Sequence, residues 1–352
     1  MPACTVFASA AKAHYILAPM SHSCPPDRRF SVAPMMDWTD RHCRAFHRVL
    51  TRRALLYTEM AVDQALIHGD PDRLIGFDPV EHPVAIQLGG AEPESLAQAA
   101  RIAEGFGYAE INLNVGCPSD RVQSGCFGAR LMLEPERVRD CLIAMGEAVS
   151  VPVTVKHRLG VDDQDPEKTL LSFIDTVAQS GVTSFTIHAR KAWLKGLSPK
   201  ENRDVPPLDY DLVHRVKSER PDLEIILNGG LKTLDEAIEN ANSLDGAMVG
   251  RAAYQTPWTL SGVDSRVFGE ADPVCDPVEA VLAYRPYLEG QLDEGVKLHA
   301  MTRHMLGLFA GRPGARKWRQ ILSAEANRPG ADWAVVARAL DAVASQPEPA
   351  TA

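Results

Sequence analysis

Short runs of branched apolar residues alternate with longer amphipathic stretches over most of the chain. Eight of these runs have the length and composition of buried strands: 30–33, 55–58, 84–88, 109–113, 153–156, 184–188, 224–227 and 245–249. Helix signals fall between them: Asp165 before Pro166 is typical of a helix start, Gly181 of its end, and Thr233 with Glu236 matches a capping box. Eight strands alternating with helices predict an α/β fold, a (β/α)8 TIM barrel.

A doubly wound parallel sheet is the competing fold for such an alternation. Its dinucleotide-binding form requires a full GxGxxG after a strand. The nearest match, Gly105-Phe-Gly107, lacks the third glycine, so the pattern favours the barrel.

Strand signals disappear after about residue 262, and two or three amphipathic helices are expected between Pro277 and Ala344. We therefore expect four parts: a disordered or loosely ordered extension at 1–29, the barrel at 30–262, a small C-terminal helical domain at 263–345, and a frayed tail at 346–352.

The composition is that of a soluble globular protein, with 45% apolar and 24% charged residues among 352. No apolar run approaches the roughly 20 residues of a membrane helix, and residues 1–29 lack a signal-peptide pattern, so we expect a cytoplasmic protein, acting as a monomer. The net charge of −9 argues weakly against nucleic acid. However, the stretch from Gly295 to Ala324 holds six Lys/Arg, two His and no acidic residue, which is enough for a local phosphate-binding face.

Seven cysteines, an odd number, show no CxxC spacing, so neither a zinc site nor an iron–sulfur cluster is expected. Without signs of secretion, a disulfide framework is not expected either. Cys117 stands in a glycine-rich stretch directly before Pro118. Two chemical roles remain open for it, nucleophile and proton donor, beside that of an inert buried thiol.

Polar side chains cluster at the ends of four predicted strands. Alternation along each strand directs them to the barrel interior: Gln87, Asn112 with Asn114, Lys156 with Arg158, and His188 with Arg190. A single inward polar residue could equally be a hydrogen-bonded group of the barrel interior. Four strands that each end in such residues indicate an active site instead, because barrel enzymes place their chemistry at the C-terminal strand ends. Because unpaired buried cations are costly, an anionic or carbonyl-rich occupant is expected.

The two last strands are followed by the residues of a phosphate site. Asn228-Gly229-Gly230 and Gly250-Arg251 occupy the loops that bind phosphate in many barrels, where glycines admit backbone N–H groups and an arginine binds oxygens in pairs. One phosphate beside an aromatic-sized opening suggests flavin mononucleotide (FMN). Lys156 would then offset negative charge on the pyrimidine edge of the reduced ring, and Gln87 would bind its amide edge.

Several motifs together resemble the tRNA-dihydrouridine synthases. They are Ala33-Pro-Met-Met-Asp-Trp-Thr-Asp40, Gln87-Leu-Gly-Gly90, Asn112-Leu-Asn-Val-Gly-Cys-Pro118, Lys156-His-Arg158, Ile187-His-Ala-Arg190, Asn228-Gly-Gly230 and Gly250-Arg251. The strings NVGCPSDRVQSGCFGARL and VKHRLGVDD are similar to the A subfamily in particular, and the resemblance runs from Phe30 to about Arg328.

This resemblance implies FMN-dependent reduction of the uracil C5–C6 bond in the D-loop of tRNA, at positions 20 and 20a, with NADPH as reductant. It implies Cys117 as the catalytic residue. The implied flavin contacts are Pro34, Met35, Met36, Gln87, Lys156, His188, Asn228, Gly229, Gly230, Gly250 and Arg251. The implied RNA contacts are Asn114, Lys200, Arg203, Arg316 and Arg319.

The chemistry of uracil favours the proton donor. Hydride arriving at C6 leaves an enolate conjugated to the C4 carbonyl, and C5 then needs a proton from the opposite face. An ordinary thiol, with a pKa of about 8.5, is mostly protonated at neutral pH and can still give up its proton. Cys126 is assigned no role, and the residues leave open how Lys156, His188, Arg158 and Arg190 divide the carbonyl and phosphate contacts.

The target base must leave folded RNA to reach such a site, and stacking and phosphate contacts would offset that cost. Arg316 and Arg319 are three apart, which predicts one helix face beside Lys317 and Trp318. The loop after the sixth strand would supply the other side of the cleft with Lys191, Lys195, Lys200 and Arg203, while Trp193 in it either stacks or packs.

Two rival functions remain. A flavin enzyme acting on a free pyrimidine, similar to dihydroorotate dehydrogenases, would share the barrel but would not need the acid-free stretch at 295–324. A barrel that binds RNA without catalysis would not need Cys117, Lys156 and His188 together.

Overall fold

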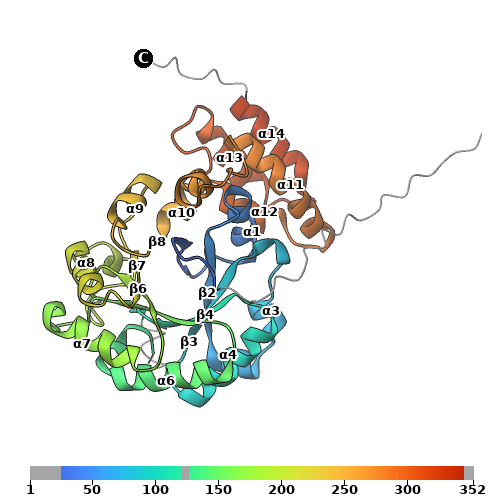
Figure 1. Cartoon of the computed structure of the whole chain (residues 1–352). Coiled ribbons are helices and arrows are strands. Elements are labelled where there is room, and N and C mark those ends of the chain that lie inside the picture. Colours follow the sequence, from blue (N-terminus) through green and yellow to red (C-terminus); the bar gives the residue numbers. More distant parts are fainter. Residues whose placement is uncertain (1–24, 120–126, 345–352) are drawn as a thin grey trace, which may run out of the picture.

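The computed structural model describes residues 25–119 and 127–344. Eight parallel strands close into a barrel in chain order, with β8 hydrogen-bonded to β1 (Figure 1). The strands are β1 (Phe30–Val32), β2 (Leu55–Val62), β3 (Val84–Gly89), β4 (Glu110–Val115), β5 (Val153–Arg158), β6 (Ser184–His188), β7 (Glu224–Asn228) and β8 (Gly246–Val249). The predicted (β/α)8 barrel is confirmed, and every strand begins within one residue of its predicted start.

The α-helices either surround the barrel on its outside or, near the C-terminus, lie beyond it (Figure 1). In the described residues they are α1 (Arg41–Leu50), α2 (Asp63–His68), α3 (Pro71–Ile75), α4 (Pro93–Gly105), α6 (Pro135–Ala148), α7 (Pro166–Ala178), α8 (Tyr210–Glu219), α9 (Leu234–Asn240), α10 (Arg251–Gln255), α11 (Pro277–Asp293), α12 (Leu298–Thr302), α13 (Ala315–Glu325) and α14 (Trp333–Ala344).

Local sequence signals start and end these helices. The Asp165 carboxylate accepts the Glu167 N–H at the start of α7, and Gly181, with φ +88°, ends the turn that follows the helix. At α9 the Thr233 hydroxyl accepts the Glu236 N–H, as predicted. The Glu236 carboxylate, however, accepts from the Lys232 N–H, one residue before the partner a capping box requires.

A ladder of polar side chains runs through the barrel interior. Gln87 Nε2 donates to Asn112 Oδ1 (2.9 Å), Asn112 Nδ2 to Thr154 Oγ1 (2.9 Å), and Thr154 to Glu110 Oε1 (2.6 Å). Because successive strand residues alternate in direction, Ile111 and its outward neighbours face the helices instead. The ladder satisfies groups whose burial would otherwise be costly.

Arg28 binds Glu110, the last residue of this ladder. Its Nε donates to Glu110 Oε2 (2.5 Å) and its Nη1 to Glu224 (3.0 Å), and the residue is 8% exposed. The sequence assigned Arg28 to a loosely ordered extension. That expectation is wrong for this residue, because its guanidinium neutralises a carboxylate that the barrel interior buries.

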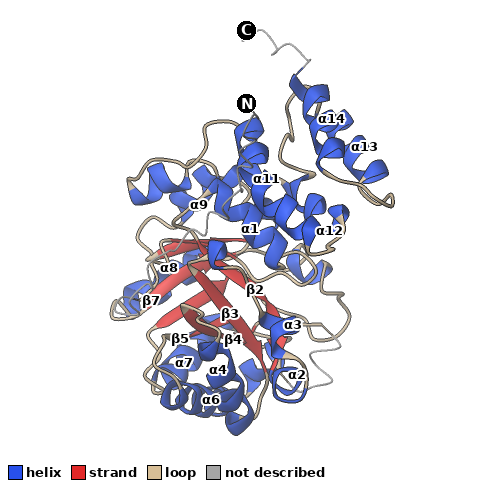
Figure 2. Ribbon diagram, turned by 90° about the vertical axis from the view of Figure 1, so that its right-hand side faces the viewer, coloured by secondary structure: helices blue, strands red, loops and turns tan. Residues whose placement is uncertain are grey.

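Between Pro277 and Ala344 the chain forms four α-helices, α11 to α14, where two or three were expected. The short α12 carried too few residues for a periodic signal. Figure 2 shows α13 and α14 as a packed pair beyond the end of the barrel. Asp40, which caps α1, joins the two regions by accepting from His304 Nε2 (3.0 Å) and pairing with Arg303. The division at residues 262 and 263 stays a prediction.

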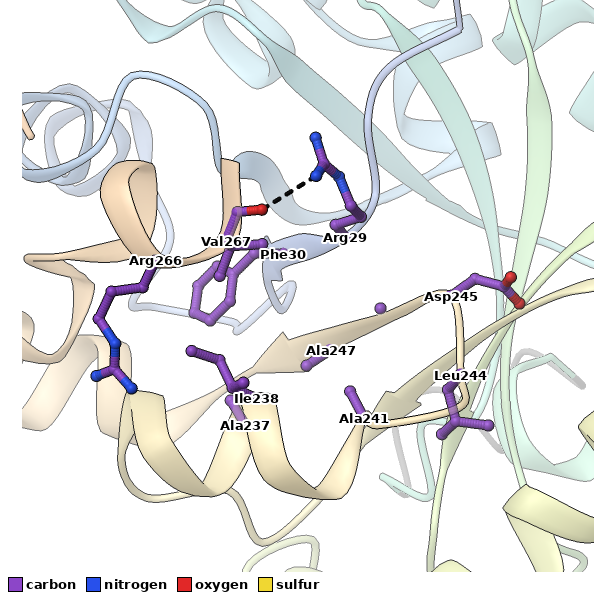
Figure 3. Close-up of a pocket in the computed structure, with 11 residues that line it drawn as sticks. Arg29, Phe30, Ala237, Ile238, Ala241, Leu244, Asp245, Ala247, Arg266 and Val267 are labelled. Carbon is purple, nitrogen blue, oxygen red and sulfur yellow. Dashed lines mark hydrogen bonds between the residues drawn. The ribbon is translucent and has the colours of Figure 1, made fainter. Parts of the chain in front are cut away.

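Within the described part of the chain, no helix has the length and apolar character needed to cross a bilayer. A surface pocket lies at the N-terminal ends of β1 and β8, between α9 and the segment Asp264–Phe268 (Figure 3). Arg29 donates to the Val267 carbonyl at its rim (3.0 Å). The predicted site residues lie at the other ends of the strands, so this pocket is separate from them.

Candidate active site

The C-terminal ends of the strands form the barrel mouth and bring the predicted interior residues together. Asn114 is the register partner of Lys156 across β4 and β5, and His188 on β6 is that of both Arg158 and Asn228. Polar groups from four consecutive strands therefore face one space.

Cys117 lies in the loop that leaves β4, and Asn114 shapes that loop. Asn114 Oδ1 accepts from the N–H groups of Gly116 (3.1 Å) and Cys117 (3.0 Å), while its Nδ2 donates to Gln87 Oε1 (2.7 Å). The Cys117 thiol is partly exposed and donates to the Ser119 hydroxyl (3.4 Å). The turn thus presents the thiol at the mouth, and most of the Asn114 amide, a predicted RNA contact, is used to hold it there.

Arg158 is buried, has no carboxylate partner among the described residues, and binds three backbone carbonyls from separate segments. Its Nε donates to Gly116 O (2.9 Å), and its Nη1 to Lys191 O and Asn202 O (3.0 Å each). Burial lowers its pKa to about 10, so it stays charged at neutral pH. Arg158 therefore ties the Cys117 loop to the loop after β6.

Lys156 presents an ammonium group to the mouth. In the described residues it has no hydrogen bond or ion pair. Burial, assisted by the charge of Arg158, lowers its pKa to about 7, and the nearby Cys117 opposes this shift. Such a cation favours an anionic group bound beside it.

His188 and Gly229 lie in contact at the ends of β6 and β7. A Cβ atom on Gly229, whose φ is +111°, would come within 2.6 Å of His188 Cδ2. Burial and the charges of Arg158 and Lys156 hold the pKa of His188 well below its usual value, so the ring is neutral. A second crowded glycine follows: a Cβ on Gly230 would lie 2.4 Å from Leu208. The backbone here leaves room only for glycine.

The loop after β8 contributes Gly250 and Arg251. Arg251 is the first residue of α10, and its guanidinium pairs with the carboxylate of Asp204 (2.8 Å) in the loop after β6. The Arg251 side chain is 36% exposed. A Cβ on Gly250 would lie 3.8 Å from Ala33 Cβ and 3.9 Å from Met35 Sδ, which are ordinary contact distances, so close packing does not require glycine there. A bound phosphate would share or displace the Asp204 contact.

The segment after β1 also lies at the mouth. Pro34 is half-buried, Met36 is 52% exposed, and the Met35 carbonyl accepts the N–H groups of Trp38 (3.1 Å) and Thr39 (2.9 Å). This turn fixes the backbone of all three predicted flavin contacts, whose roles stay predictions.

The predicted RNA contacts lie in two places. Lys200 and Arg203 are exposed in the loop after β6, and Arg316 and Arg319 are exposed on α13 with Lys317. No ion pair involves these three α13 cations within the described ranges. Trp318 does not share their exposed surface but is buried: each residue turns about 100° around the helix, so Trp318 lies about 100° from Lys317 and Arg319 and about 200° from Arg316. Its indole instead donates to the Met305 carbonyl (3.0 Å).

Sequence reasoning missed Asn202 and Asp204. Both lie in the long loop after β6, where no periodicity marks an inward side chain, and their partners come from distant segments. Cys126 lies outside the described residues. Among the residues that are described, no group of three His, Cys, Asp or Glu side chains could hold a metal ion.

Comparisons with known proteins agree with this geometry. Residues 31–344 match the family model described as dihydrouridine synthase (Dus). The chain is 55% identical over 327 residues to a tRNA-dihydrouridine(20/20a) synthase from Escherichia coli O6:H1, covering 93% of this chain and 98% of the relative. It is 56% identical over 311 residues to the Xanthomonas campestris protein of that name (88% and 92% covered) and 57% over 316 residues to that of Yersinia pestis (90% and 91%).

Proposed function

The chain belongs to the dihydrouridine synthase family, and we propose that it reduces the C5–C6 double bond of D-loop uridines 20 and 20a in tRNA. Enzymes of this family are flavin-dependent oxidoreductases. We infer that FMN is the flavin here and NADPH its reductant. The observation that carries the proposal is that the Cys117 loop and Lys156, which has no ion-pair partner among the described residues, lie at one barrel mouth.

The residues present fit FMN. Gly229 and Gly230 have positive φ and no room for a Cβ, which suits a loop that binds phosphate through backbone N–H groups, and Arg251 begins α10 directly after β8, where it would supply a cation to the same phosphate. Lys156 would balance the negatively charged edge of the reduced ring. Gln87 already bonds Asn112 and Asn114, which leaves one amide hydrogen for a ligand. When bound, FMN supplies the hydride that C6 of uracil receives.

The protein's own task is then to bind the base and to deliver a proton. Addition at C6 places charge on the C4 oxygen and makes C5 basic. The Cys117 thiol, held at the mouth by Asn114, donates its proton to C5 and leaves a thiolate that solvent reprotonates. The neutral His188 ring and the Lys156 ammonium are the nearby groups able to donate a hydrogen bond to a uracil carbonyl.

Features of the structure disfavour the two rival functions. A free-pyrimidine reductase is disfavoured by the exposed cations of α13, which a small substrate does not need. An RNA-binding barrel without catalysis is disfavoured by the retention of Cys117 and Lys156 in a shaped mouth.

The test is dihydrouridine formation, measured by mass spectrometry, in unmodified tRNA incubated with the purified protein, FMN and NADPH. Fragments that carry D-loop uridines should gain the mass of two hydrogen atoms, and fragment mapping should place the gain at 20 and 20a. Reduction of free uracil or orotate, without dihydrouridine formation in tRNA, would contradict this proposal and support the free-pyrimidine reductase instead.

A further inference from the structure

The loop after β6 continues the β5–β6 pair beyond the mouth. Val161 and Ala192 form a parallel bridge, with the Ala192 N–H donating to Gly160 O (2.9 Å) and the Asp162 N–H to Ala192 O (2.8 Å). The next residue, Trp193, is therefore held close to the strand ends.

Asn202 fixes the Trp193 backbone on both sides. Its Oδ1 accepts the Trp193 N–H (2.7 Å), and its Nδ2 donates to the Trp193 carbonyl (2.9 Å). Asn202 is fully buried, although it lies in a loop. One amide thus immobilises the residue that carries the indole.

The same buried amide residue is connected to the Cys117 loop. Arg158 binds the Asn202 carbonyl, the Lys191 carbonyl and the Gly116 carbonyl with one guanidinium. The position of Trp193 is therefore set relative to the residue that precedes Cys117.

The indole itself is open to solvent on a cationic surface. Trp193 is 37% exposed, and the Lys191 ammonium lies 5.4 Å from its ring centroid. Lys195, Lys200 and Arg203 are exposed in the same loop, and none forms an ion pair with another described residue. An aromatic face fixed among free cations suits a nucleobase and its phosphates, because bases stack on such rings whatever their sequence while cations track the backbone.

We propose that Trp193 is a stacking platform for an unpaired RNA base adjacent to the uridine that reaches Cys117. The inference rests on the proposed function, because it presumes an RNA substrate at this mouth. It adds a contact that is independent of hydride and proton transfer.

Substitution of Trp193 tests the platform. Trp193→Leu should lower kcat/KM for tRNA about tenfold or more, mainly through KM, while NADPH-dependent flavin reduction stays unchanged. Trp193→Phe keeps a ring and should recover most of the loss. Ile238→Ala is the matched control: this side chain is also 37% exposed but lies at the opposite end of the barrel, so its kinetics should stay those of the wild type.

A tRNA with an abasic nucleotide on the 5′ or the 3′ side of the target uridine identifies the partner base. If Trp193 stacks on that base, the abasic substrate and Trp193→Leu should cost less together than their separate effects multiplied. Fully multiplicative effects at both positions, or a Trp193→Leu enzyme with wild-type kcat/KM, would overturn the platform. Wild-type protein that forms no dihydrouridine on intact tRNA would instead remove the proposed function.

Discussion

Lys156 makes the stability of the flavin-free protein depend on pH in a direction the structure fixes. Burial and the charge of Arg158 lower its pKa from 10.5 to about 7. Between these values the unfolded chain keeps the proton that the folded protein has lost. Because the unfolded state then binds more protons, stability rises with pH across this window and falls as the pH drops towards 7.

The size of the effect follows from the same values. They differ by about 3.5, and one pKa unit corresponds to ~1.4 kcal/mol, which sets a ceiling of ~5 kcal/mol. The side chain retains some solvent exposure, so screening reduces the expected cost of the charge to ~2–3 kcal/mol. Lys156→Met keeps the aliphatic length and removes the charge. It should stabilise the flavin-free protein by about that amount at pH 6.5 and by only ~1.3 kcal/mol at pH 9.5, one unit below the unfolded pKa of 10.5.

Denaturant unfolding of flavin-free wild type and Lys156→Met at both pH values measures this difference. Lys200→Met is the control, because Lys200 is exposed and its loss should change stability equally at both pH values. A Lys156→Met effect that is the same at pH 6.5 and 9.5 would refute the reasoning. With reduced FMN bound, the anionic ring edge should reduce the dependence of wild-type stability on pH.

Three further predictions follow from single contacts. Gly229→Ala forces a Cβ against His188 at a φ of +111°, so FMN retention on gel filtration should fall and stability should drop by ~1–3 kcal/mol; unchanged flavin content would contradict it. Glu110→Ala leaves the Arg28 charge short of its buried partner, and chemical unfolding should show a loss of ~3 kcal/mol or more, whereas a near-neutral result would mean that water enters the barrel floor. Arg319→Gln should weaken tRNA binding and reduce the slope of log Kd against log salt by about one, measured by fluorescence anisotropy; an unchanged slope would mean that α13 makes no phosphate contact there.

The sequence predicted the barrel well because its signals are local. Strand starts follow from short apolar runs, and strict alternation along a strand identifies which side chains point inward, as for Asn112 and Lys156. Crowded glycines were recognisable for a similar reason: Gly229 follows a strand at a position where barrels place phosphate.

Contacts between distant loops could not be predicted in this way. Arg158 was visible as an interior cation, but its three carbonyl partners are chosen by how the loops close, which no spacing encodes. The burial of Arg28 likewise depends on Glu110, 82 positions away. Trp318 shows a different limit, because adjacency in sequence was read as adjacency on a helix face.

The central claim is that Cys117 protonates C5 of a tRNA uridine at this mouth. It is tested most directly by mixing NADPH-reduced wild type and Cys117→Ala with unmodified tRNA in a single turnover, following flavin reoxidation and dihydrouridine together. The account predicts equal rates of prior flavin reduction by NADPH, and reoxidation by tRNA that is slower in Cys117→Ala by about 10²–10⁴-fold. Equal reoxidation rates and equal dihydrouridine yields from the two proteins would contradict it.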